Sequence, residues 1–283
     1  MRRSITGIDH AIVLVRNLDA ARDGYERLGF TVAPRGLHPP EHGTANHTVM
    51  LEREYLELLG VMTPTPGNAH WQSALARGDG LSALALQTPS ADAVVAEMAG
   101  AGVALDPPED FARQVVLPDR TRTQAAFRTA HFPKGVAPGF HLFCCEHRTR
   151  HVTWRPELLR HPNGAVALDE VLATSDAPAA AAAALGTLFS TTPVSERDGS
   201  CLVDTGNSTI RFATACSLAE RFAPIGLSQL RAAALVGLTL RTSSIAAAEA
   251  ALVRSGTRHA KVTGGIAVAP EDACGALLVF REG

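Results

Sequence analysis

The feature that most constrains the fold is a strand and helix pattern within residues 7–60, in which one histidine and one glutamate stand among apolar neighbours. Run 8–15 is rich in β-branched residues and too short for a stable helix, so it predicts a strand. A polar cap at Asn17 and a glycine stop at Gly29 predict a helix between them. The next segments are predicted to be extended, which gives the order βαβββ: 30–33, 45–51 and 54–59.

His10 and Glu57 are the candidate metal ligands of this unit. Side chains alternate faces along a strand, so His10 shares a face with Ile12 and Glu57 shares one with Leu59. If the two strands are neighbours, His10 and Glu57 converge. Imidazole and carboxylate together suit Zn, Mn, Fe or Ni. A lone strand histidine is more often a hydrogen-bonded core residue, whereas a buried glutamate needs a partner, so Glu57 carries more of this prediction.

The same pattern of strand, helix and strands returns three more times along the chain. Because each βαβββ module leaves a concave sheet face exposed, two modules are expected to pair and close a cavity. The fold class is therefore α+β, with four βαβββ modules paired into two domains. The predicted modules are 5–63 and 80–150 in domain 1–160, and 164–215 and 233–283 in domain 161–283.

Only the first pair of modules offers candidate inward ligands. Ala83 stands where His10 stands in the first module, and Phe143 is the counterpart of Glu57. His141 and His147 share a face with Phe143 but lie roughly 7 and 13 Å from it along an ideal strand. We therefore expect the functional cavity in the N-terminal pair and a structural role for the C-terminal pair.

Composition bounds the partners and the compartment. The 283 residues are 46% hydrophobic and 19% charged, as in a globular protein, and the net charge of −2 argues against nucleic acid. Five cysteines without framework spacing favour a reducing, cytoplasmic location. There is no signal h-region and no apolar run of about 18 residues, so neither export nor membrane insertion is expected. The arginine-rich run 148–160 predicts an exposed connection between the domains.

The chain carries six short motifs: Gly7-Ile8-Asp9-His10, Gly43-Thr44-Ala45-Asn46, Tyr55-Leu56-Glu57-Leu58, Cys145-Glu146-His147, Trp154-Arg155-Pro156 and His161-Pro162-Asn163-Gly164. These motifs resemble the vicinal oxygen chelate superfamily, and within it the largely uncharacterised glyoxalase-like proteins. The resemblance implies glyoxalase/dioxygenase-like domains with a U-shaped cavity and, in many relatives, a divalent metal that chelates vicinal oxygens of the substrate. His10 and Glu57 match the ligand strands of that superfamily, whereas Ala83 departs from its third ligand position.

Two functions are consistent with this sequence. The first is a metal-dependent lyase, isomerase or dioxygenase acting on a small oxygenated metabolite. There His10, Glu57 and His147 or His141 would hold the metal. The second is a metal-free protein that binds or sequesters a small molecule, as drug-resistance members of the superfamily do, which the loss of a ligand at Ala83 favours.

The enzyme hypothesis assigns roles to three further side chains. His47 is the candidate general base, although a surface imidazole is the alternative. Arg128 would hold an anionic substrate group unless it is a solvated strand residue, and His141 would contact the substrate. The partner is a small-molecule substrate. The oligomeric state stays open, with a homodimer among the alternatives.

Overall fold

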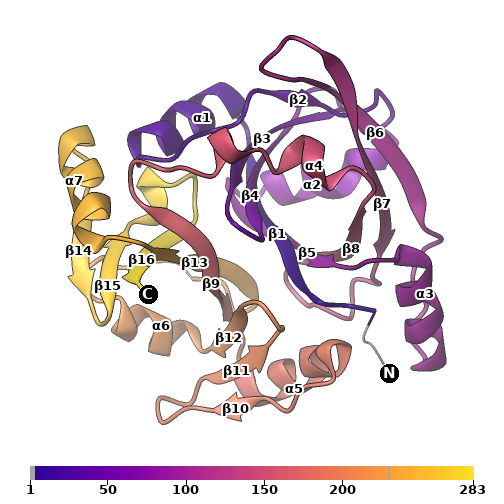
Figure 1. Cartoon of the computed structure of the whole chain (residues 1–283). Coiled ribbons are helices and arrows are strands. Elements are labelled where there is room, and N and C mark those ends of the chain that lie inside the picture. The colour runs from indigo at the N-terminus through magenta and orange to yellow at the C-terminus, as the bar shows by residue number, and fades with distance from the viewer. Residues whose placement is uncertain (1–3, 229) are drawn as a thin grey trace.

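The computed structural model describes residues 4–228 and 230–283, which form two eight-stranded sheets (Figure 1). The first, sheet A, has the strand order β2-β3-β4-β1-β5-β8-β7-β6, and the second, sheet B, has β10-β11-β12-β9-β13-β16-β15-β14. In each sheet the first strands of two modules lie antiparallel at the centre: β1 on β5 and β9 on β13. The predicted α+β fold of four βαβββ modules in two paired domains is confirmed.

Sheet A contains the first two modules. Their elements are β1 (Gly7–Val15), α1 (Leu18–Arg27), β2 (Gly36–Leu37), β3 (Thr44–Met50), β4 (Tyr55–Val61), η1 (Pro66–Asn68), α2 (Ala69–Leu75), β5 (Gly80–Gln87), α3 (Ala91–Gly100), β6 (Glu109–Val116), β7 (Arg122–His131) and β8 (His141–His147). The predicted extended segment 30–33 forms no strand, and β2 lies a few residues later. Edge strand β6 was not predicted, because its charged and exposed residues lack apolar alternation.

The last two modules form sheet B. A short connection, α4 (Arg150–Thr153) and η2 (Pro156–Leu158), precedes it. Its elements are β9 (Ala165–Thr174), α5 (Pro178–Phe189), β10 (Val194–Ser195), β11 (Cys201–Asp204), β12 (Thr209–Ala213), α6 (Ala215–Arg221), β13 (Ala234–Thr242), α7 (Ile245–Ser255), β14 (His259–Val262), β15 (Gly265–Val268), η3 (Pro270–Asp272) and β16 (Leu277–Glu282).

The connection between the sheets is partly buried, so the prediction of an exposed segment was wrong. Val152 and Leu158 are buried, and the indole of Trp154 donates a hydrogen bond to Leu51 O at 3.0 Å. The guanidinium of Arg150 lies 3.4 Å from the centre of the Trp154 ring. Arg150 therefore stacks on Trp154. Helix α4 covers one end of the concave face of sheet A, where Val152 packs with the apolar side chains of that face.

One apolar core joins the two sheets through their convex faces. Residues of α1, α3, α5 and α7 contribute to it, together with the outward-facing apolar side chains of both sheets. Phe30, which follows α1, stacks on Phe280 of the last strand with 5.8 Å between ring centres. Gly29 lies so close to Ala251 that a Cβ on Gly29 would lie 2.8 Å from the Ala251 Cβ. The concave faces are covered separately, by α2 and α4 over sheet A and α6 over sheet B.

Asn207, in the turn between β11 and β12, clamps sheet B to the start of β1. Its Nδ2 donates to Ile8 O at 2.7 Å and to Glu54 Oε1 at 2.8 Å, and its Oδ1 accepts from Ile8 N at 2.8 Å. Gly7, at φ +151°, leaves room for the amide, because a Cβ there would lie 2.3 Å from Asn207 Oδ1. The clamp thus fixes the strand that carries His10.

Truncating the clamp in Asn207→Ala is expected to lower the free energy of unfolding by about 2–4 kcal/mol, since three polar groups lose their partner. Chemical denaturation measures this change. Asp204→Ala is the control, because its hydrogen bond to Gly206 N lies in the same turn but is exposed. If the two variants lost the same free energy of unfolding, the contacts of Asn207 with Ile8 and Glu54 would contribute no stability beyond that of the turn itself.

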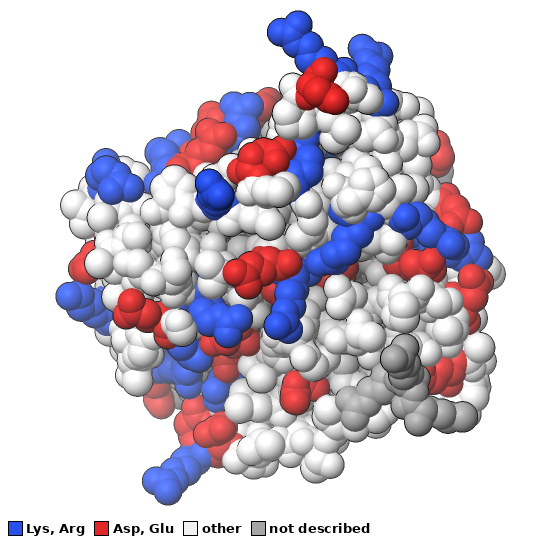
Figure 2. Space-filling view, viewed as in Figure 1, with Lys and Arg blue, Asp and Glu red and all other residues white. Residues whose placement is uncertain are grey.

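Charged side chains of both signs are interspersed over the face of the molecule shown in Figure 2. Among the described residues, no helix is long and apolar enough to cross a membrane.

Candidate functional site

The concave face of sheet A brings His10 and Glu57 together, as strand alternation predicts. β1 and β4 are parallel neighbours with Ile12 opposite Glu57. His10 Nε2 lies 3.3 Å from Glu57 Oε2, and both side chains are buried. This contact agrees with the expectation that the two side chains lie close together, and Glu57 also lines a cavity.

Neighbouring polar groups orient both side chains. Asp9 Oδ1 lies 2.7 Å from His10 Nδ1, an approach made next to a register shift between Ile8 and His10 in the pairing of β1 with β5. This leaves Nε2 of His10 to face Glu57. The amide of Asn46 on β3 donates to Glu57 Oε1 at 2.7 Å. The Tyr55 ring stacks on the His10 ring with 4.3 Å between ring centres. These contacts hold the side chains of His10 and Glu57 in place.

The two groups form a buried ion pair. Burial disfavours protonation of His10, but hydrogen bonds to Asp9 and Glu57 outweigh it and raise its pKa to about 9. Burial likewise favours neutral Glu57, yet the hydrogen bond and positive charge of His10 lower its pKa to about 2. At neutral pH the pair is therefore imidazolium and carboxylate.

His38 is a third member of the site that the sequence analysis missed. Its Nδ1 is 2.8 Å from Thr44 Oγ1, and its Nε2 is 3.8 Å from Glu57 Oε1. Burial lowers its pKa to about 4, so it is neutral. His38 begins the loop between β2 and β3, which contains Pro39, Pro40 and Gly43, and no periodicity assigns a face to a side chain there. The only signal was its place six residues before Thr44 of the quoted motif.

The donor set His10, His38 and Glu57 fits a divalent metal. Both imidazoles direct Nε2 toward the Glu57 carboxylate, and both have the other ring nitrogen held by an oxygen, as metal-bound histidines do. Two histidines and one carboxylate are a common set for zinc and for non-haem iron.

The symmetry-related half of the site is apolar. β5 pairs with β8 so that Ala85 is opposite Phe143, just as Ile12 is opposite Glu57 on the other side. Ala83 and Phe143 thus occupy the places that mirror His10 and Glu57, as the sequence analysis proposed. Phe143 instead contacts the His10 ring edge-on, with ring centres 5.5 Å apart.

A second group of potential ligands lies beside the first. Atoms of Asp9, His10 and Cys145 all lie within 4.8 Å of one another and are buried. Burial raises the pKa of the Cys145 thiol well above its usual value, and the negative charge of Asp9 adds to this, so the thiol is protonated. Asp9 Oδ1 already shares a hydrogen bond with His10 Nδ1. This group therefore supports the His10 ring rather than forming a separate centre.

The remaining predicted site residues lie apart from the His10–Glu57 pair. His147 Nε2 is 3.0 Å from Asp9 Oδ1, the same oxygen that His10 Nδ1 approaches, so it contacts Asp9 rather than Glu57. His47 shares its face of β3 with Ala45 and Val49, which belong to the core around α1, and its Nδ1 contacts Ala33 O at 2.8 Å. Arg128 points to the convex side, where it pairs with Asp92 and Asp110.

His141 belongs to a group of three histidines at the other end of the cavity. His141 Nε2 is 2.8 Å from His131 Nδ1, and the His70 ring lies 5.0 Å from the His141 ring. A cavity of about 240 Å³ extends from this group to Glu57 and is lined by His38, Glu57, His70, Trp71, His131 and Phe143. It is large enough for a small metabolite.

Two of these histidines are expected to make the protein sensitive to acid. Burial, together with nearby positive charges, lowers the pKa of His70 to about 4 and of His141 to about 3, from 6.5 in the unfolded chain. Between pH 6.5 and 4 the unfolded state therefore binds more protons, and stability falls as pH decreases. Melting temperatures across this range should fall more steeply for the wild type than for His70→Gln/His141→Asn. Parallel curves would contradict this assignment.

The concave face of sheet B carries a buried ion pair. Glu170 Oε1 on β9 accepts from Arg211 Nε on β12 at 2.8 Å, and both side chains are buried. Arg211 also donates to Ser200 Oγ at 2.6 Å. Because the Glu170 carboxylate is already paired with the Arg211 guanidinium, it has little affinity for a metal cation.

Comparison with known proteins gives the same family as the sequence motifs. Residues 8–189, more than half of the chain, match the model of the glyoxalase-like domain. No curated protein matches the chain.

Solved structures show the same fold at low sequence identity. A hypothetical protein from Staphylococcus aureus is 13% identical with a TM-score of 0.70, covering 98% of this chain and 99% of its own. A variant of 4-hydroxymandelate synthase from Streptomyces coelicolor is 12% identical with a TM-score of 0.61, at 99% and 92% coverage. A xylose isomerase-like TIM barrel/4-hydroxyphenylpyruvate dioxygenase fusion protein is 14% identical with a TM-score of 0.59, at 100% and 49% coverage. The resemblance to the vicinal oxygen chelate superfamily is thereby confirmed.

Proposed function

Because the chain belongs to the glyoxalase-like domain family, we propose that it is a divalent-metal-dependent enzyme acting on a small oxygenated metabolite in the cavity of sheet A. The observation that carries this proposal is the convergence of two oriented imidazole nitrogens, from His10 and His38, on the Glu57 carboxylate. His38 takes the place given to His147 in the sequence analysis, because His147 faces Asp9 instead.

A divalent cation held by these residues would act as a Lewis acid on a carbonyl or enediolate oxygen of the substrate. The chain itself supplies the orientation: Asp9 and Thr44 fix the two imidazoles, and Asn46 fixes the carboxylate. Apolar side chains on the concave face, Ile12, Leu59 and Phe143, exclude water and strengthen electrostatic interactions inside.

His131 is the proposed proton acceptor. It lines the same cavity as Glu57, and burial lowers its pKa, so the imidazole is neutral and can take a proton. Its Nδ1 lies against His141, which fixes the ring. A base at this position favours an isomerase or lyase, in which a proton leaves a carbon next to a carbonyl, over a dioxygenase.

Metal content of the protein purified without a histidine tag tests this proposal. We expect about one divalent ion per chain and, after chelation, recovery of that content on adding back the metal. Binding should be accompanied by proton release, because His10 must lose its proton to become a ligand. A protein that takes up no metal at neutral pH would contradict the proposal.

The alternative is a metal-free protein that binds or sequesters a small molecule. Ala83 and Phe143 favour it, since half of the site offers no donor, and the His10–Glu57 ion pair is satisfied without a metal. Under this alternative, ligands bind equally well before and after chelation. Under the enzyme proposal they require the metal.

A further inference from the structure

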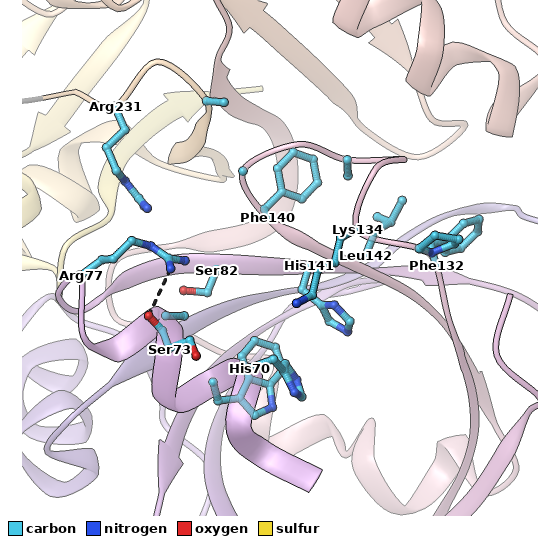
Figure 3. A pocket seen from close by; sticks show the side chains of 16 residues that line it. His70, Ser73, Arg77, Ser82, Phe132, Lys134, Phe140, His141, Leu142 and Arg231 are labelled. Atoms are coloured by element: carbon cyan, nitrogen blue, oxygen red, sulfur yellow. Dashed lines mark hydrogen bonds between the residues drawn. The ribbon is translucent and has the colours of Figure 1, made fainter. Parts of the chain in front are cut away.

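A second cavity, of about 460 Å³, opens beside the sheet A cavity and between the two halves of the chain (Figure 3). Its walls come from α2, the loop between β7 and β8, and the segment that leads into β13. His70 and Trp71 line both cavities, so they form the wall between them. Gly139, at φ +97°, allows the β7–β8 loop to approach Ala233, where a Cβ would lie 2.3 Å from the carbonyl oxygen. We call this cavity the interdomain cleft.

Three cationic side chains line the interdomain cleft: Arg77, Lys134 and Arg231. In Figure 3, Arg77 and Arg231 extend toward each other from different segments. The guanidinium of Arg77 donates to the backbone oxygen of Ser73 at 3.1 Å. Among the described residues, none of the three cations forms an ion pair, and no carboxylate lines the cleft.

Positive charges in one cleft without an acid repel each other, and an anion would relieve this cost. The pKa of Arg231 is lowered, first by burial and then by the charge of Arg77, which reflects the repulsion. Burial and the charge of Lys134 also keep His70 and His141 neutral, so their rings remain able to donate a single hydrogen bond.

The charge and the walls together identify the ligand class. The two neighbouring cations Arg77 and Arg231 exceed the single charge of one carboxylate. A phosphate monoester carries about −1.5 to −2 at neutral pH and has three acceptor oxygens. An arginine guanidinium group can donate two parallel hydrogen bonds to two oxygens of one phosphate. Trp71 and Phe140 add flat apolar surface to the same cleft. A cavity of this volume is within the usual range for small-molecule sites.

We propose that the interdomain cleft binds a small organic phosphate, with the phosphate between Arg77 and Arg231 and the apolar part of the molecule against Trp71 and Phe140. This site contains none of the proposed metal ligands. It therefore goes beyond the proposed function and does not depend on it.

Calorimetric titration with phenyl phosphate at low ionic strength tests the proposal. The wild type is expected to bind phenyl phosphate. Arg77→Gln/Arg231→Gln should bind it about a hundredfold more weakly or not at all, because the loss of each charged hydrogen-bond donor lowers the affinity about tenfold or more. The control Arg197→Gln/Arg254→Gln removes the same charge from positions outside the cleft and should stay within about twofold. Circular dichroism checks that both variants are folded.

Three results would overturn the proposal: no binding to the wild type at millimolar phenyl phosphate, equal weakening in the control variant, or equally tight binding of phenylacetate, which would indicate a carboxylate site. Two further measurements separate this site from the metal centre. Glu57→Gln should bind phenyl phosphate like the wild type, and the Arg77→Gln/Arg231→Gln variant should keep its metal content.

Discussion

Replacing Glu57 by glutamine is expected to lower the affinity for a divalent metal by at least about a hundredfold and to remove any metal-dependent activity. Changing an outer-shell partner of a metal ligand already costs about 10–100-fold, and here the only carboxylate ligand loses its charge. Glutamine has nearly the same shape and can keep the contact with Asn46 by rotating its amide. The change therefore reports on charge rather than on packing. Titration with Mn²⁺ or Co²⁺ measures the affinity.

Glu41→Gln is the matched control, because Glu41 lines the same cavity but is exposed and is not among the proposed ligands. It should change metal affinity by less than about threefold, since exposed charges are well screened. If Glu57→Gln bound metal like the wild type and only melted at a lower temperature, Glu57 would be a buried structural residue. The metal-free binding protein would then be the better description.

Glu170→Ala is expected to destabilise the protein by about 3–5 kcal/mol, because it leaves the buried guanidinium of Arg211 without its partner. The loss should appear in the free energy of unfolding from chemical denaturation. Metal content should not change, since the C-terminal concave face has only a structural role in this account.

The neighbouring residue provides the control. Asp169 forms an ion pair with Arg281 at 3.0 Å, but both side chains are about one-third exposed. Asp169→Ala should therefore cost no more than about 1 kcal/mol. A loss of metal from Glu170→Ala with its fold intact would show that the C-terminal half contributes to the site after all.

The fold could be predicted from the sequence because four modules repeat one apolar pattern. Alternation along β1 and β4 is sufficient to place His10 and Glu57 on the same side of the sheet. The same rule locates the apolar counterparts Ala83 and Phe143. Regular strands keep their period, so their faces can be read directly from the residues.

The parts that could not be predicted lie where regular structure is interrupted. His38 begins a loop that contains proline and glycine, and Asp9 lies beside a register shift, so strand alternation gave neither of them a place in the site. His47 is an exception, because it lies in a regular strand whose alternation puts it with Ala45 and Val49 on the face packed toward α1. The interdomain cleft needs contacts between distant segments, such as Arg77 and Arg231, which no local pattern shows.

Anomalous diffraction from crystals grown with Mn²⁺ tests the central claim most directly. The account predicts one strong peak within coordination distance of His10 Nε2, His38 Nε2 and the Glu57 carboxylate, and its loss in Glu57→Gln. No peak at this position, or a dominant peak at His70, His131 and His141 instead, would contradict it.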